Sequence, residues 1–242
     1  MPLEQLRKRA GKTLIQGFFR GASRLGRLHP QADPARHGVE VVRDVAYLPT
    51  GLPEHKLDIW RPKHRDGPLP ALLYVHGGGF TILSKETHWA MALAFARRGF
   101  CVFNVNYRLA PEHRYPAAIA DVCAAYRWLI EHAPSWQADL SRLVVAGESA
   151  GANLVIALTV AACFERPEPH ARAVFDTGIV PRVALPACGV LQVSDIGRIR
   201  RRKPNVGTFV NDRLHEVTHS YLGDQRPPHV DLADPLLLLE SE

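Results

Sequence analysis

Long uncharged apolar runs and paired cysteines are both missing from this sequence of 242 residues. No run reaches the roughly 18 uncharged apolar residues that a membrane-spanning helix needs, so the sequence predicts no membrane span. The cysteines form no Cys-x-x-Cys pair, and each lies in an apolar run. We therefore expect buried free thiols and a reducing compartment, the cytoplasm. The four cysteines are Cys101, Cys123, Cys163 and Cys188.

Acidic residues are scarce in the first 28 positions, where Glu4 stands against seven basic side chains. Apolar residues recur there three or four apart, which predicts one amphipathic helix over residues 1–28. These apolar residues are Leu3, Leu6, Ala10, Leu14, Phe18, Ala22 and Leu25. Charges interrupt every apolar segment, which excludes a secretory signal. A transit peptide and a helix lying on an anionic membrane share this composition, but we favour a helix packed over an active site.

A second basic cluster occupies residues 198–203, and the whole chain has a net charge of +6 and a pI of about 9.3. The cluster consists of Arg198, Arg200, Arg201, Arg202 and Lys203. No aromatic residues are interleaved with either cluster, and no nucleic-acid-binding motif lies beside them. We interpret both clusters as solvated faces and expect no nucleic-acid partner.

Apolar runs alternate with helical patterns from residue 39 onward. This rhythm predicts one α/β domain over 39–242, preceded by the helix and a linker over 1–38, with a mainly parallel sheet and helices on both faces. Strands are expected at 39–47, 56–60, 71–75, 100–105, 142–146 and 190–193, the first two as an antiparallel hairpin. Helices are expected at 87–98, at 118–132, at 152–163 and at 209–222, the last within a cap insertion over about 196–228.

The segment Gly147-Glu148-Ser149-Ala150-Gly151 joins an expected strand to an expected helix. A strand that turns into a helix across Gly-x-Ser-x-Gly is the sequence form of a nucleophile elbow. Such a turn is too tight for side chains at its outer positions, hence the two glycines. Ser149 would then be presented above the sheet, and the N–H of Ala150 would be free to face an anion.

A second glycine segment, His76-Gly77-Gly78-Gly79-Phe80, follows the expected strand at 71–75. Free N–H groups of Gly77 and Gly78 can converge on one point, as an oxyanion hole requires. A phosphate-binding loop is the alternative, but neither Gly-x-x-x-x-Gly-Lys-Ser/Thr nor Gly-x-Gly-x-x-Gly spacing is present.

These two segments, with residues 107–112 (Tyr-Arg-Leu-Ala-Pro-Glu) and Pro116-Ala117-Ala118, resemble the hormone-sensitive-lipase-like esterases of the α/β-hydrolase fold. The resemblance implies hydrolysis of carboxylic esters of small hydrophobic groups, without cofactor or metal. It implies Ser149 as nucleophile, with Gly77, Gly78 and Ala150 as oxyanion donors. His76, Gly79, Gly147, Glu148 and Gly151 would shape the motifs, with Glu148 standing where the family usually has Asp.

An acid and a histidine should follow the serine in that order. The histidines available are His170, His215, His219 and His229, and the acids include Asp195, Asp212, Asp224, Asp231 and Asp234. Asp195 follows the expected strand at 190–193, but the resemblance makes that strand the one before the cap, which does not carry the acid. His215 and His219 lie four apart, and we interpret them as an ordinary helix face rather than a catalytic or metal pair.

Asp234-Pro235-Leu236 is similar to the family's acid motif, yet it precedes an expected strand at 236–239, whereas the acid should follow one. We therefore predict an esterase truncated at its C-terminus, with the acid and the histidine absent from the chain and an apolar sheet edge exposed. The alternative is a catalytically incomplete hydrolase-fold protein that binds a ligand or partner. Small-molecule esters are the expected partners, and peripheral membrane contact through the first helix is a further possibility.

Overall fold

The computed structural model describes residues 3–64, 66–205, 207–223 and 230–241. Its centre is a six-stranded sheet with the spatial order β1-β2-β4-β3-β5-β6. The strands are β1 (Val39–Ala46), β2 (Lys56–Pro62), β3 (Leu69–Val75), β4 (Cys101–Val105), β5 (Ala138–Glu148) and β6 (Val183–Ala187). β1 and β2 form the predicted antiparallel hairpin, and β4, β3, β5 and β6 run parallel to one another. The mainly parallel sheet is thus confirmed.

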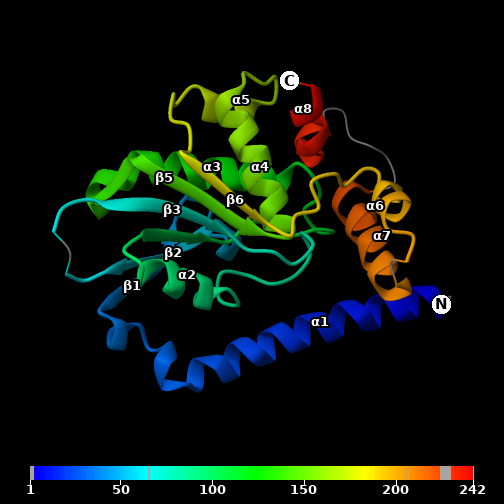
Figure 1. Cartoon of the computed structure of the whole chain (residues 1–242), viewed down its shortest axis with the longest axis horizontal. Helices are drawn as coiled ribbons and strands as arrows, with labels where there is room; N and C mark the ends of the chain where they lie inside the picture. The colour runs from blue at the N-terminus through cyan, green and yellow to red at the C-terminus, as the bar shows by residue number, and fades with distance from the viewer. Residues whose placement is uncertain (1–2, 65, 206, 224–229, 242) are drawn as a thin grey trace.

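Eight helices accompany the sheet in the described part of the chain (Figure 1). They are α1 (Leu3–Leu28), α2 (Trp89–Ala96), α3 (Ala117–His132), α4 (Ala150–Cys163), α5 (Pro169–Phe175), α6 (Gly197–Arg202), α7 (Thr208–Leu222) and α8 (Pro235–Ser241). None of the helices in these described ranges is long and apolar enough to cross a membrane.

Alternation along β3 divides the core between the two faces of the sheet. Ala71, Leu73 and Val75 point into the larger core, which lies against α3, α4 and α5. Leu72 and Tyr74 point into a smaller core with α2 on the opposite face. All five are at most 2% exposed, as expected for a strand covered on both faces. The sheet therefore holds the carboxyl ends of β3 and β5 in fixed register beside one another.

Two predicted strands were wrong. The strand after α4 is β6, not residues 190–193, because Val183–Ala187 pairs with β5 despite Pro186, which an edge strand tolerates. Residues 190–193 instead carry main-chain groups bonded to side chains: Val190 O accepts from Asn153, and Val193 N–H donates to Asp234. Residues 236–239 belong to α8, where Pro235 occupies the first helical position.

The cysteine prediction was only half right. Cys101 and Cys123 are buried free thiols, whereas Cys163 and Cys188 are exposed. Cys163 is the last residue of α4, and Cys188 follows the edge strand β6, so the apolar runs around them end at the surface. Burial raises the pKa of the Cys101 thiol to about 12.

The N-terminal helix α1 forms as predicted, but a different face of it meets the protein. Leu14, Phe18 and Leu25 are 70–71% exposed, although the spacing assigned them to the apolar face. The face of α1 that packs against the protein is the one with two glycines, which let neighbouring helices come close. Gly11 lies against the Arg213 guanidinium of α7, and Gly26 lies against the Trp89 ring of α2. The helix therefore runs beneath α2 and reaches α7 (Figure 1). Leu14, Phe18 and Leu25 face away from the protein.

Candidate active site

Ser149 lies at the sharp turn between β5 and α4. Its backbone has φ 52° and ψ −115°, a region that a residue other than glycine occupies only under strain. A Cβ on Gly147 would lie 2.5 Å from Gly151 O, and a Cβ on Gly151 would overlap Val75 O. The glycines are required because the turn packs backbone on backbone. The Ser149 N–H donates to Ala187 O at 2.8 Å, which ties the turn to the end of β6.

The glycine segment after β3 lies directly against this turn. A Cβ on Gly77 would be 3.3 Å from Ser149 Cβ, so any side chain there would crowd the serine. Gly78 has φ 115°, and its carbonyl accepts the N–H groups of Thr81 and Ile82, both at 3.1 Å. Ala150 begins α4, so its N–H lies in the helical turn that has no intrahelical partners. The three expected oxyanion donors, Gly77, Gly78 and Ala150, thus come from two segments packed together.

His76 supports the loop from beneath. It is 1% exposed, its Nδ1 lies 2.7 Å from Gly77 O, and its ring stacks on Tyr107 with centroids 4.3 Å apart. The Tyr107 hydroxyl donates to His76 O at 2.9 Å. Burial, with a smaller contribution from the charge of His88, lowers the pKa of His76 to about 3, so the ring is neutral and its Nδ1–H can donate to Gly77 O.

Glu148 pairs with a residue that sequence reasoning missed. Its Oε1 lies 2.7 Å from His88 Nε2, and this hydrogen bond lowers the pKa of the Glu148 carboxyl. His88 immediately precedes α2 and is 6% exposed. The two residues are separated by 60 positions in the chain, so no local pattern could have joined them.

A cavity of about 280 Å³ opens over Ser149. Its floor consists of Gly78, Ser149 and Ala150, and its walls come from α1 and α7, which lie almost 200 positions apart in the chain. The wall residues are Lys12, Ile15 and Phe19 of α1 and Val210, Arg213, Leu214, Glu216 and Val217 of α7. Arg213 forms an ion pair with Glu216, which leaves a largely apolar wall. The predicted packing of α1 over the site therefore holds.

Three of the candidate acids are held by groups other than Ser149. Asp195 binds Arg201 at 2.5 Å, and Asp231 binds Arg166 at 2.9 Å. Asp234 is 3% exposed and accepts the N–H groups of Val193 and Ser194, a structural role. Of the other candidates, His170 is on α5, Asp212, His215 and His219 are on α7, and Asp224 and His229 lie outside the described residues.

Within the described ranges, Ser149 Oγ forms no hydrogen bond with a histidine or carboxylate. No group of three or more potential metal ligands occurs among these residues either. His215 and His219 are exposed on α7, as an ordinary helix face would be.

Comparison with known proteins gives consistent matches. A family model described as "alpha/beta hydrolase fold" matches residues 72–238. A carboxylesterase of Mycobacterium tuberculosis, NlhH, is 39% identical over 146 residues, which cover 52% of this chain and 46% of the relative. The esterase LipI of the same organism is 46% identical over 97 residues, covering 39% of this chain and 30% of the relative. The chain thus matches less than half the length of these curated relatives.

Solved structures give the same result. A bacterial heroin esterase superimposes with a TM-score of 0.66 and 30% identity, covering 82% of this chain and 61% of that one. The esterase LipW from Mycobacterium marinum superimposes with a TM-score of 0.67 and 29% identity, covering 89% of this chain and 63% of that one.

Proposed function

The chain belongs to the α/β-hydrolase fold family, and we propose that its site cleaves carboxylic esters through an acyl-enzyme on Ser149. The esterase names of its relatives support this activity. The dimensions of the cavity and its largely apolar walls favour short-chain or small hydrophobic substrates. The free thiols support a reducing compartment such as the cytoplasm as the place of action.

In the proposed reaction, Ser149 Oγ forms a bond to the ester carbonyl carbon and gives up its proton to a general base. The carbonyl oxygen becomes an oxyanion held by the N–H groups of Gly77, Gly78 and Ala150. The C–O bond to the alcohol then breaks and the alcohol leaves with a proton, after which water attacks the acyl-enzyme and releases the acid. We assign neither the base nor the carboxylate that orients it to a described residue.

One observation carries the proposal: the strained Ser149 turn and the Gly77 segment pack against each other at the floor of a cavity. The test is hydrolysis of p-nitrophenyl butyrate by the purified chain beside Ser149→Ala. Turnover that disappears in Ser149→Ala supports the esterase and means that a base acts on Ser149. Hydrolysis that Ser149→Ala leaves unchanged would argue against it.

The alternative is a catalytically incomplete protein that binds a ligand in this cavity. The absence of a histidine on Ser149 among the described residues favours it. It predicts no Ser149-dependent turnover, but retained binding of a short ester that Phe19→Trp, in the cavity wall, weakens.

We further propose that α1 contacts an anionic lipid surface. Leu14, Phe18 and Leu25 form an exposed apolar stripe, and Arg20 and Arg24 are exposed on the same helix. A second copy of the chain would bring the same basic charges together, whereas anionic lipid would neutralise them. Phosphatidylglycerol vesicles should sediment the chain in a salt-sensitive manner, and Phe18→Ser should weaken this, unlike the control Leu239→Ser on α8. Equal binding to phosphatidylcholine would contradict the proposal.

A further inference from the structure

The carboxylate of Glu148 lies beside the place where the oxyanion would form. A Cβ on Gly77 would be 3.1 Å from Glu148 Oε1 and 3.3 Å from Ser149 Cβ, so carboxylate and nucleophile flank the same glycine. Glu148 also lines the cavity. A negative charge so close to a developing oxyanion opposes acyl transfer unless a positive charge balances it.

His88 is hydrogen-bonded to this carboxylate through Nε2. The contacts of its other ring nitrogen, Nδ1, indicate the protonation state of the ring. The Thr87 hydroxyl donates to Ser84 O at 2.7 Å, and His88 Nδ1 lies 3.0 Å from the same carbonyl. Thr87 Oγ1 also lies 2.9 Å from Nδ1, but its own hydrogen points to Ser84 O. Nδ1 thus faces two oxygen acceptors, which favours a hydrogen on Nδ1. Nε2 lies 2.7 Å from Glu148 Oε1, which also only accepts when ionised. Both ring nitrogens thus face acceptors, an arrangement that fits an imidazolium beside a carboxylate.

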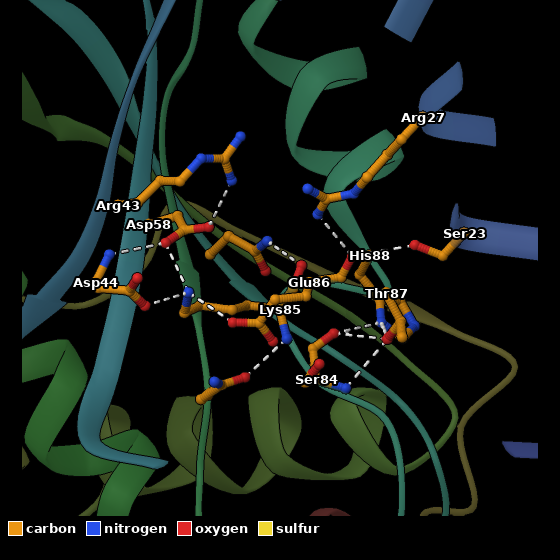
Figure 2. A network of polar contacts seen from close by, with 12 residues as sticks. Ser23, Arg27, Arg43, Asp44, Asp58, Ser84, Lys85, Glu86, Thr87 and His88 are labelled. Carbon is orange, nitrogen blue, oxygen red and sulfur yellow. Dashed lines mark hydrogen bonds and ion pairs between the residues drawn. The ribbon is translucent and has the colours of Figure 1, made fainter. Parts of the chain in front are cut away.

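The segment that carries His88 is held by an ion cluster around the buried Lys85 (Figure 2). Lys85 is 2% exposed, and its Nζ binds Asp58 at 2.7 Å and Asp44 at 2.9 Å. Its main chain is held as well, because Lys85 N–H donates to Asn106 Oδ1 at 2.7 Å and Lys85 O accepts from Asn104 Nδ2 at 3.0 Å. Residues of the sheet and its loops thus hold both the side chain and the main chain of Lys85, three positions before His88.

The N-terminal helix holds the same segment from the other side. Glu86 O accepts hydrogen bonds from Ser23 Oγ at 3.1 Å and from the Arg27 guanidinium at 2.8 Å (Figure 2). Trp89 Nε1 donates to Ser23 Oγ at 3.1 Å. His88 therefore lies on a short stretch whose neighbours on both sides are anchored, so its ring has little freedom to leave Glu148.

We propose that His88 is a positioning residue for the oxyanion site, balancing the charge of Glu148 and holding that side chain against Gly77. This inference rests on the proposed esterase function. It gives His88 a role that depends on its positive charge and acts through Glu148, and it explains why a carboxylate can stand next to the nucleophile.

A double-mutant cycle separates this role from a merely structural one. His88→Gln keeps a neutral amide that can donate to Glu148 but leaves the carboxylate charge unbalanced. We expect kcat for p-nitrophenyl butyrate to fall about 10–100-fold with KM changed less than about 3-fold. Adding Glu148→Gln should return kcat to that of Glu148→Gln alone. A loss that Glu148→Gln does not relieve, or that appears in KM, would overturn the proposal.

His132→Leu is the matched control, because His132 stacks on Trp128 outside the cavity lining and should leave kcat unchanged. If His88→Gln does not fold, NMR of the His88 ring in the wild-type protein still tests the proposal. Its charged neighbour is Glu148, and its aromatic neighbours are His76 and Tyr74. We expect both ring nitrogens to carry a hydrogen in the wild-type protein at pH 7.

The NMR result does not depend on turnover, which keeps the two proposals distinguishable. A neutral His88 ring in the wild-type protein at pH 7 overturns the inference even if the chain is an active esterase. For a chain without turnover, n-butylboronic acid replaces the ester, because it forms a tetrahedral anion on a serine. His88→Gln should weaken its Ser149-dependent binding about 10-fold, and Glu148→Gln should restore it. Binding that His88→Gln leaves unchanged contradicts the inference.

Discussion

Phe80 and Tyr221 stack face to face, with ring centroids 3.8 Å apart and planes 4° apart. Phe80 ends the glycine segment beside Ser149, and Tyr221 lies in the last turn of α7, so this contact joins the glycine segment to a wall of the cavity. Gly79 adds to the joint, because a Cβ there would lie 2.7 Å from Val217 Cγ2 of α7. Loop and cavity wall are therefore one packed unit.

Substitutions of Tyr221 should separate its ring from its hydroxyl. The hydroxyl is buried and has no hydrogen-bond partner among the described residues, so Tyr221→Phe should leave stability unchanged or raise it by about 1 kcal/mol. Tyr221→Ala removes the ring stacked on Phe80 and should cost about 3–5 kcal/mol. Urea denaturation of the three proteins measures both effects, and a Tyr221→Phe variant as unstable as Tyr221→Ala would contradict this prediction.

Stability should fall in acid partly because of Glu86. Burial raises the pKa of its carboxyl, but hydrogen bonds from Lys85 and Ser84 outweigh this and bring it to about 2. A carboxyl whose folded pKa lies below its unfolded value, near 4.5, stabilises the fold above pH 4.5 and loses this contribution as pH falls toward 2. Thermal melting across that range should show a smaller loss for Glu86→Gln than for wild type. The exposed Glu112→Gln is the control, and equal slopes for all three would refute the prediction.

Glycines in the chain should respond to alanine in opposite directions. Gly151→Ala places a methyl group onto Val75 O, and we expect a loss of about 3 kcal/mol or more together with displacement of Ser149. Gly17 lies in α1, where an added Cβ would meet no atom of the described residues within 4 Å, so Gly17→Ala should stabilise the protein by about 0.5–1 kcal/mol. Calorimetry of both variants tests the pair. A tolerated Gly151→Ala would mean that the turn can open.

The edge strand β6 should make the purified chain associate. Val183 and Leu185 are 45% and 44% exposed on a strand whose partner on one side is β5. Light scattering should show mass increasing with concentration, and Leu185→Lys should reduce the effect. A monodisperse monomer that melts cooperatively would contradict this expectation.

Local sequence patterns predicted the central strands and the Ser149 turn, because neighbouring residues in the chain determine both. The apolar runs at 71–75 and 100–105 were predicted to be strands, and they form β3 and β4. The turn at Ser149 was visible because backbone crowding demands Gly147 and Gly151. The helix α7 was found within one residue of its observed start.

Two of the failures concern contacts between distant parts of the chain. The spacing in α1 predicted which residues form its apolar stripe, but the inner face was chosen by Gly11 and Gly26, where α7 and α2 come close. The pairing of His88 with Glu148 depends on the sheet bringing two loops together, and no local pattern reports it. Residues 236–239 are apolar in either a strand or a helix, so composition alone could not separate the two.

The two walls of the cavity are synthesised at different times, because α1 is near the start of the chain and α7 is near its end. Phe19 of α1 emerges early, but Val210 and Val217 of α7, which complete the enclosure, follow about 190 residues later. At 5–20 residues per second, this corresponds to roughly 10–40 s of translation. During that interval α1 has no α7 to lie against, while β3, β4 and β5 can already pair. The nascent chain would therefore present Ser149 on a formed sheet before the cavity over it is enclosed.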